Sequence, residues 1–320
     1  MKKTDIGIIF EHPEWHIPLF EALSTSGLDV AKIDLKKGAF NFGSLPEASL
    51  YYNLVSPSAY LRGNQRAIPF AYSVCRTLES MGRRVINGSA SMALEFSKSN
   101  QLALLKSLGV DHPQSVVFND AGALSILEEK LKWPMILKPE QGGSGARMYE
   151  LNSISELIEI LTLKPELWQP DGLLLLQEKL NYDHKFGIIR LEYLDGKLLY
   201  AMRVVTNGVF NLCPSVTCNP ENGDAGTCSL EIVACKPEFY PYPEVPAVAV
   251  ETGRSIMAKA GHSIGSVEYL ETLDGRRVFY DINSNSNLRP SIAAAFGIDP
   301  FDEVANYLRW QSKHGERKSA

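Results

Sequence analysis

The first ninety or so residues alternate between short apolar runs and helical patterns, and this alternation strongly limits the possible folds. Residues 5–10 form an apolar run, residues 15–26 have helical periodicity, and residues 29–35 alternate as a strand does. Two further strand patterns follow at residues 49–55 and 83–86, and an amphipathic helix lies between them at residues 65–81. Strands that alternate with helices imply a parallel sheet with helices on its faces. We therefore expect an α/β lobe over residues 1–95.

The rest of the chain is predicted to form two more units of mixed α+β structure. The unit at 96–180 contains an apolar strand at 135–139 that leads into a glycine-rich loop. The unit at 181–320 is rich in strand patterns and ends with a helical pattern at 300–313. No low-complexity linker separates these units, so we expect compact lobes with a cleft between them.

Three oxygen ligands near the C-terminus are spaced as a magnesium–nucleotide site would need them. Glu268 lies in a strand pattern at 265–272, and Asp281 and Asn283 lie in the next one, at 276–283. Side chains alternate along a strand, so Asp281 and Asn283 share one face, and hairpin pairing can bring Glu268 beside them. Carboxylate and amide oxygens are ligands that Mg²⁺ prefers. The trio is therefore a candidate metal site.

A lysine and a glycine loop upstream suit the phosphate groups that such an ion would bridge. Lys138 lies within an apolar strand, where a lysine is rare without a partner, and a phosphate or an acidic side chain would serve as one. The loop at 141–145 reads Gln-Gly-Gly-Ser-Gly, which lets backbone N–H groups approach phosphate oxygens. It matches neither the Walker A pattern nor a dinucleotide fingerprint. A plain glycine hairpin is the alternative.

Charge and composition exclude several classes of protein. A net charge of −5 gives no electrostatic reason to expect nucleic acid as a partner. The apolar run at 173–176 is far too short to span a membrane, and no signal-peptide pattern opens the sequence, so we expect a cytoplasmic protein. Five cysteines, an odd number, favour free thiols over disulfides. Four of them lie close together without the spacing of a zinc site: Cys213, Cys218, Cys228 and Cys235.

Taken in order, these features resemble the ATP-grasp fold over about two-thirds of the chain. Lys98, followed by Gly109 and Pro113, resembles the beginning of that fold. Residues 133–145 resemble its second lysine and flexible phosphate loop, and residues 174–180 resemble the hinge against which adenine binds. Glu268, Asp281 and Asn283 resemble its metal ligands, and the α/β lobe resembles the domain that precedes it. The resemblance is greatest to the RimK-like ligases, which join carboxylates to amines.

The resemblance implies a role for individual residues. Lys98 and Lys138 would hold the α- and β-phosphates of ATP, Glu178 would accept a hydrogen bond from the adenine amino group, and Asp183 would bind the ribose. Arg203 would steady the transferred phosphoryl group or the acyl-phosphate, and the candidates for gripping a carboxylate are Arg289, Arg62 and Arg203. The nucleotide-binding residues implied are Lys98, Lys138, Gly142, Gly143, Ser144, Gly145, Gln177, Glu178, Lys179, Leu180 and Asp183. The catalytic residues implied are Lys138, Arg203 and Arg289, and the ligands of Mg²⁺ or Mn²⁺ are Glu268, Asp281 and Asn283.

The sequence departs from the ATP-grasp pattern at several positions. Asp281 stands where glutamate is usual, and it reaches less far toward a metal ion. The common Asp-x-Arg after the hinge appears as Asp183-His184-Lys185, without the arginine. The residues after Asn283 lack the usual Pro-Gly ending. These changes affect the acceptor side of the expected site more than the nucleotide side.

The activity implied is that of an ATP- and Mg²⁺-dependent ligase. It would join a carboxylate, of an amino acid or a peptide, to an amine through an acyl-phosphate, with ADP and phosphate released. A kinase of small-molecule hydroxyls on the same scaffold, or a non-catalytic ATP-binding module, are the alternatives. The expected partners are small-molecule acids and amines, with neither nucleic acid nor membrane involved, and a homodimer is left open.

Overall fold

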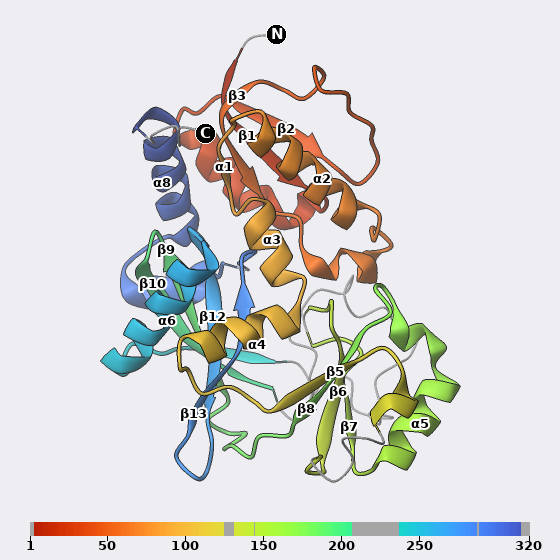
Figure 1. Cartoon of the computed structure of the whole chain (residues 1–320). Coiled ribbons are helices and arrows are strands. Elements are labelled where there is room, and N and C mark those ends of the chain that lie inside the picture. The colour runs from red at the N-terminus through yellow and green to blue at the C-terminus, as the bar shows by residue number, and fades with distance from the viewer. Residues whose placement is uncertain (1–2, 125–130, 144, 207–236, 287, 315–320) are drawn as a thin grey trace.

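The computed structural model describes residues 3–124, 131–143, 145–206, 237–286 and 288–314. In these residues the chain folds into three sheets that follow one another along the sequence (Figure 1). We call them the N-terminal sheet, the central sheet and the C-terminal sheet. The N-terminal sheet is parallel and the other two are antiparallel, which confirms the predicted α/β fold class with α+β lobes.

The N-terminal sheet has four parallel strands in the order β2-β1-β3-β4. Apolar side chains alternate between its two faces: Ile8 packs beneath α1 and α8, whereas Ile9 packs beneath α2. Both faces are therefore covered by helices, as the alternation of strands and helices predicts. The bounds are β1 Thr4–Phe10, β2 Val30–Asp34, β3 Ala48–Asn53, β4 Val85–Ile86, α1 Ile17–Thr25, α2 Ala67–Ser80 and α8 Pro300–His314.

The central sheet has four antiparallel strands in the order β5-β8-β6-β7. Helix α5 (Ile154–Leu163) covers one of its faces and begins after Ser153, whose hydroxyl accepts a hydrogen bond from the Glu156 N–H at 3.2 Å. The opposite face, which carries Lys138, is turned toward the rest of the molecule. The strands are β5 Ser115–Phe118, β6 Met135–Pro139, β7 Tyr149–Leu151 and β8 Leu174–Glu178.

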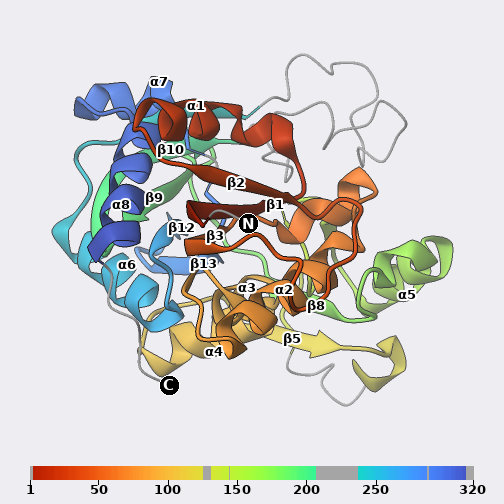
Figure 2. The same ribbon diagram turned by 90° about the horizontal axis from the view of Figure 1, so that it is seen from above.

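The C-terminal sheet has five antiparallel strands in the order β11-β10-β9-β12-β13. Helix α6 (Ala247–Ala260) covers one face together with α4 (Lys98–Ser107), although α4 comes before the central sheet in the sequence. In both ribbon views α5 lies on the far side of the molecule from α6 and α8 (Figure 2). The strands are β9 Ile188–Leu194, β10 Lys197–Val205, β11 Glu238–Pro241, β12 Ile264–Glu271 and β13 Arg277–Asn283.

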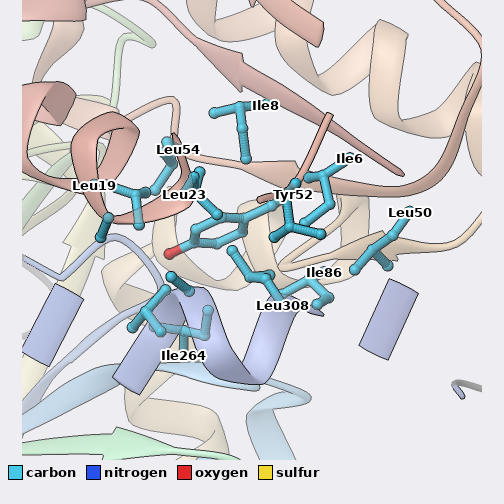
Figure 3. Packing of buried hydrophobic residues seen from close by; sticks show 14 of the residues in the cluster. Ile6, Ile8, Leu19, Leu23, Leu50, Tyr52, Leu54, Ile86, Ile264 and Leu308 are labelled. Atoms are coloured by element: carbon cyan, nitrogen blue, oxygen red, sulfur yellow. The ribbon is translucent and has the colours of Figure 1, made fainter. Parts of the chain in front are cut away.

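The last helix, α8, packs the C-terminal part of the chain against the N-terminal sheet. It packs on the N-terminal sheet through Val304, Ala305 and Leu308, and Leu308 lies near Tyr52 and Ile86 in this cluster (Figure 3). Ile264 of β12 belongs to the same cluster, so one core connects the N-terminal and C-terminal sheets. The shorter helices are α3 Ser89–Glu95 and α7 Pro290–Ala293, with 3-10 turns η1 Pro13–His16, η2 Pro57–Arg62, η4 Pro165–Trp168 and η5 Ala294–Phe296.

Two expectations from composition concern membranes and cysteines. Among the described residues no helix is long and apolar enough to cross a membrane. Cys75 is buried with a free thiol in the core beneath α2. The four clustered cysteines, Cys213, Cys218, Cys228 and Cys235, lie outside the described residues.

Candidate active site

A cavity of about 530 Å³ is lined by residues from all three sheets. Tyr52 comes from the N-terminal sheet, Lys138 and Gln177 from the central sheet, and Arg190 and Glu268 from the C-terminal sheet. Charged groups buried in a concave site shared by several elements are typical of ligand-binding or catalytic sites. We therefore take this cavity as the candidate active site.

The β12–β13 hairpin brings the predicted metal ligands to the cavity. Its register places Glu268 directly opposite Asp281, as expected, and Asn283 opposite Ser266. A bulge between Glu268 and Tyr269 inserts Tyr280, whose hydroxyl donates to Glu268 Oε2 at 3.0 Å. Glu268, Asp281 and Asn283 all line the cavity. The hairpin thus gathers the oxygen ligands that the sequence pattern indicated.

The oxygen atoms of the hairpin suit a hard cation that is also bound by water or phosphate oxygens. Among the described residues no group of three His, Cys, Asp or Glu side chains could hold a metal ion by itself. Glu268 and Asp281, with the Asn283 amide oxygen, leave coordination positions for water or phosphate, as Mg²⁺ requires. Burial and the neighbouring Asp281 carboxylate raise the pKa of Glu268. A divalent cation would offset both effects.

The two predicted lysines stand beside this acidic hairpin. The Lys98 ammonium forms an ion pair with Asp281, and Lys138 is buried with 7% of its surface exposed. In the described part of the chain no carboxylate lies within ion-pair distance of Lys138. Burial, and next the nearby Lys98 charge, lowers the pKa of Lys138 to about 8. An anionic ligand in the cavity would stabilise both ammonium groups.

The glycine loop after β6 also faces the cavity. Gly142, Gly143 and Gly145 line it, while Ser144 lies outside the described residues. A Cβ atom on Gly143 would lie 3.0 Å from Ser58 Cβ, so glycine lets the loop approach η2 of the N-terminal lobe. Gly145 has a φ of +67°, which glycine adopts without strain.

The hinge strand β8 divides its side chains between two faces. Gln177, Lys179 and Leu180 line the cavity. The Glu178 carboxylate instead accepts hydrogen bonds from Arg276 Nη1 at 2.8 Å and from the Gln114 N–H at 2.7 Å. Because alternate residues of a strand point in opposite directions, that carboxylate is turned away from the cavity, and the adenine contact expected of it is not formed there.

Asp183, the residue expected to bind the ribose, lies elsewhere in the structure. It is exposed, and its Oδ1 accepts a hydrogen bond from the Lys185 N–H at 2.9 Å. This contact closes a local turn of the kind that aspartate favours. The neighbouring side chains that line the cavity are Tyr182 and His184.

The arginine of the C-terminal sheet that faces the cavity is Arg190, not Arg203. Arg203 pairs across the strands with Ile189, which belongs to the core beneath α6, so the two share the covered face. Its Nη1 donates to the Phe186 carbonyl at 3.1 Å, and its guanidinium lies over the rings of Phe186 and Tyr240. The expected contact of Arg203 with a transferred phosphoryl group is therefore corrected: this side chain points to the wrong face.

Arg190 links two buried carboxylates, Glu192 and Glu268. Its Nε donates to Glu192 at 2.7 Å and its Nη1 donates to Glu268 at 3.0 Å. The Glu192 carboxylate also accepts the hydroxyl of Ser286, from the segment after β13. Sequence analysis missed Arg190 and Glu192, although a signal existed: both are charged residues within an apolar strand, as Lys138 is.

Of the three arginines considered for gripping a carboxylate, Arg289 lines the cavity, whereas Arg62 and Arg203 do not. Arg289 lines the cavity, with its guanidinium carbon 3.4 Å from the centre of the Phe239 ring. Arg62 forms an ion pair with Glu11 in which both side chains are almost fully buried, and it lies over the ring of Trp15. Arg62 thus stabilises a loop of the N-terminal lobe.

Comparison with known proteins gives a consistent result for the fold. No protein-family model and no curated protein matches the chain. Among solved structures, the ATP-grasp ligase PsnB with its minimal precursor is similar at 18% identity and a TM-score of 0.66, over 96% of this chain and 99% of that one. The RimK domain protein of Sphaerobacter thermophilus is 16% identical (TM-score 0.67, 94% and 98% covered), and the D-alanine–D-alanine ligase of Bacillus anthracis is 16% identical (TM-score 0.69, 98% of each).

These similarities extend over nearly the whole of both chains. The chain therefore has the fold of the ATP-grasp ligases, including their preceding α/β lobe, and the predicted resemblance is confirmed at the level of the fold. A fold supports many chemistries, so activity has to be argued from the cavity itself.

Proposed function

We propose that the chain is an ATP- and Mg²⁺-dependent ligase that joins a carboxylate to an amine through an acyl-phosphate. The observation that carries this proposal is the charge arrangement of one cavity, in which two lysines and a glycine loop stand beside an acidic hairpin. Phosphoryl transfer depends on positioning and on charge neutralisation, and this arrangement supplies both. The similar structures of PsnB contain Mg and ADP, or AMPPNP.

On the nucleotide side, each group has a distinct task. Lys98 and Lys138 hold the phosphate oxygens, and the backbone N–H groups of Gly142, Gly143 and Gly145 donate to them. Gln177, Lys179 and Leu180 provide the wall against which the adenine packs. Glu268, Asp281 and Asn283 hold Mg²⁺, which neutralises charge on the phosphates when bound.

On the acid side, arginines orient the reacting carboxylate. Arg289 grips the substrate carboxylate, and Arg190, close to Glu268, stabilises the phosphoryl group as it is transferred. A carboxylate oxygen attacks the γ-phosphorus, the bond to the ADP oxygen breaks, and the acyl-phosphate forms. An amine nitrogen then attacks the acyl carbon, phosphate leaves, and the amine loses a proton. Enclosure between three lobes protects the acyl-phosphate from water.

Trapping with hydroxylamine tests this reaction directly. Wild-type protein, ATP and Mg²⁺ are incubated with a panel of amino acids, N-acetyl amino acids and dipeptides, and hydroxamate and ADP are measured. A ligase forms both with at least one acid, because hydroxylamine attacks an acyl-phosphate. Asn283→Ala is the matched negative control, since it removes one metal ligand.

Other outcomes distinguish the alternative activities. Transfer of phosphate to a hydroxyl substrate without any hydroxamate would identify a kinase. Nucleotide binding in calorimetry without ADP release across the whole panel would identify a binding module. Absence of heat with both ATP and ADP in the presence of Mg²⁺ would overturn the nucleotide assignment altogether.

A further inference from the structure

One buried carboxylate of the cavity differs from the others in its partners. Glu95, the last residue of α3, is 3% exposed and lines the cavity. It accepts hydrogen bonds from the hydroxyl of Ser284 and from the N–H of Asn285, the latter at 3.3 Å. Among the described residues no lysine, arginine or histidine side chain lies within ion-pair distance of it.

The other acids among the described residues that line the cavity all have a cationic partner. Lys179 pairs with Glu150, Arg190 with Glu268, and Lys98 with Asp281. A carboxylate buried without a counter-charge is costly, so such groups are normally paired or protonated. Burial raises the pKa of Glu95 to about 7. A cation that enters the cavity would favour the charged form and supply the missing partner.

The surface next to Glu95 is apolar. Asn285, whose N–H binds Glu95, also donates from its side chain to the Leu54 carbonyl at 2.5 Å, so Glu95 and Leu54 are neighbours. Leu54 belongs to the apolar cluster that reaches helix α8, and Figure 3 labels Leu19, Tyr52 and Leu54 of this cluster. The members of the cluster that line the cavity form what we call the apolar wall: Leu19, Tyr52, Leu54, Leu288, Phe301 and Val304.

A buried anion at the edge of an apolar wall selects a particular kind of ligand. A primary ammonium group can donate hydrogen bonds to the carboxylate, while an attached aliphatic or aromatic group is itself removed from water when it packs on the apolar wall. A neutral ligand would leave the Glu95 charge without a partner, and a small polar amine would make no apolar contact with the wall. The two features together favour an amine that carries an apolar side chain.

We propose that this end of the cavity binds the amine substrate as an ammonium ion, with Glu95 as its counter-charge and the Leu54–Phe301–Val304 wall as the site for its apolar side chain. The Glu95 carboxylate then takes up the proton that the nitrogen must lose before it attacks the acyl carbon. The inference rests on the proposed ligase function and adds the class of the amine to it. In the fold, the N-terminal sheet and α8 would then determine which amine is accepted.

Calorimetry with three matched probes tests the site without knowledge of the natural acid. L-Leucinamide has the cation and the side chain, glycinamide lacks the side chain, and N-acetyl-L-leucinamide lacks the cation. With ADP and Mg²⁺ present, wild-type protein should bind L-leucinamide about tenfold or more tightly than either of the others. Equal binding of the acetylated probe, or no binding of L-leucinamide at all, overturns the proposal.

Two variants separate the charge from the wall. Glu95→Gln keeps groups that can bond to Ser284 and Asn285 but removes the charge, and it should weaken L-leucinamide binding about tenfold or more with ADP affinity unchanged. Phe301→Ala should reduce the preference for L-leucinamide over glycinamide, whereas Trp310→Ala, on the exposed side of the same helix, should not. If Glu95→Gln does not fold, the comparison of probes on wild-type protein decides the question.

The outcomes also separate this inference from the proposed function. If ADP itself gives no heat, the ligase proposal fails. If ADP binds but L-leucinamide binds no better than N-acetyl-L-leucinamide, only the amine site fails.

Discussion

The two faces of the C-terminal sheet are built from the same strands and have opposite characters. On the face beneath α4 and α6, alternate residues such as Ile189, Leu191 and Val267 form a dry core. On the face toward the cavity, their sequence neighbours Arg190 and Glu268 are charged, with 16% and 4% of their side chains exposed. Because successive side chains of a strand point to opposite faces, one strand contributes both to the core and to the candidate active site.

The comparison shows where stability and activity are separable. The covered face gains its free energy from apolar area removed from water, which any well-fitting side chain can supply. The cavity face holds charges that are costly to bury and are kept in place by one another. Substitutions on the covered face should therefore change mainly the free energy of unfolding, and substitutions on the cavity face mainly the turnover.

The largest effect is expected at the metal hairpin. Glu268→Gln or Asn283→Ala should lower turnover about a hundredfold to a thousandfold, because a metal-held charge stabilises the transition state. Thermal unfolding of Glu268→Gln should change little, since the amide oxygen of the new side chain would still accept the Arg190 hydrogen bond. Near-normal turnover in the hydroxamate assay would show that these residues do not hold a catalytic ion.

The covered face should respond in the opposite way. Ile189 is fully buried in the core beneath α6, so Ile189→Ala should lower the free energy of unfolding by about 3 kcal/mol. The folded fraction should keep its turnover, because the side chain does not face the cavity. Urea titration gives the first quantity, and activity per folded molecule gives the second. Activity lost without a change in stability would contradict the division of the sheet.

Arg190 and Arg203, on opposite faces of the C-terminal sheet, give a second test of the difference between the faces. Arg190→Met leaves Glu192 and Glu268 without their shared partner, and kcat should fall about tenfold or more. Arg203→Met, one strand away on the covered face, should leave kcat within about twofold, as a partly exposed arginine over aromatic rings contributes little to the cavity. A larger loss at Arg203 than at Arg190 would reverse our placement of the phosphoryl contact.

The smallest effect concerns the stability contribution of a buried histidine between α6 and β12. His262 is 4% exposed, and burial lowers its pKa to about 4 from the ordinary 6.5. Between these values the unfolded chain binds the proton and the folded one does not, so acidification favours unfolding. From pH 7 to pH 5.5 the free energy of unfolding should fall by about 1 kcal/mol through this residue. His262→Leu should flatten that part of the pH profile, and substitution of the exposed His314 should not.

Part of the candidate site could be predicted because its signals are local. Asp281 and Asn283 share a face through strand alternation, and the hairpin turn brings Glu268 opposite Asp281. Lys138 was recognisable as a charge within an apolar strand. Arg190 carries the same signal and was overlooked in favour of Arg203. The register of β10 shifts between Leu198 and Tyr200, so the face of Arg203 cannot be counted from the turn.

The remaining parts depend on contacts between residues far apart in the chain. The sequence by itself determined the order of strands and helices, the glycine loop and the acidic hairpin, because these follow from periodicity and turn chemistry. Only the tertiary structure decided that Glu178 turns toward Arg276 and that Glu95 lines the cavity. It alone also seats α8 on the N-terminal sheet. Such pairings are selected by packing among whole lobes, which no local pattern encodes.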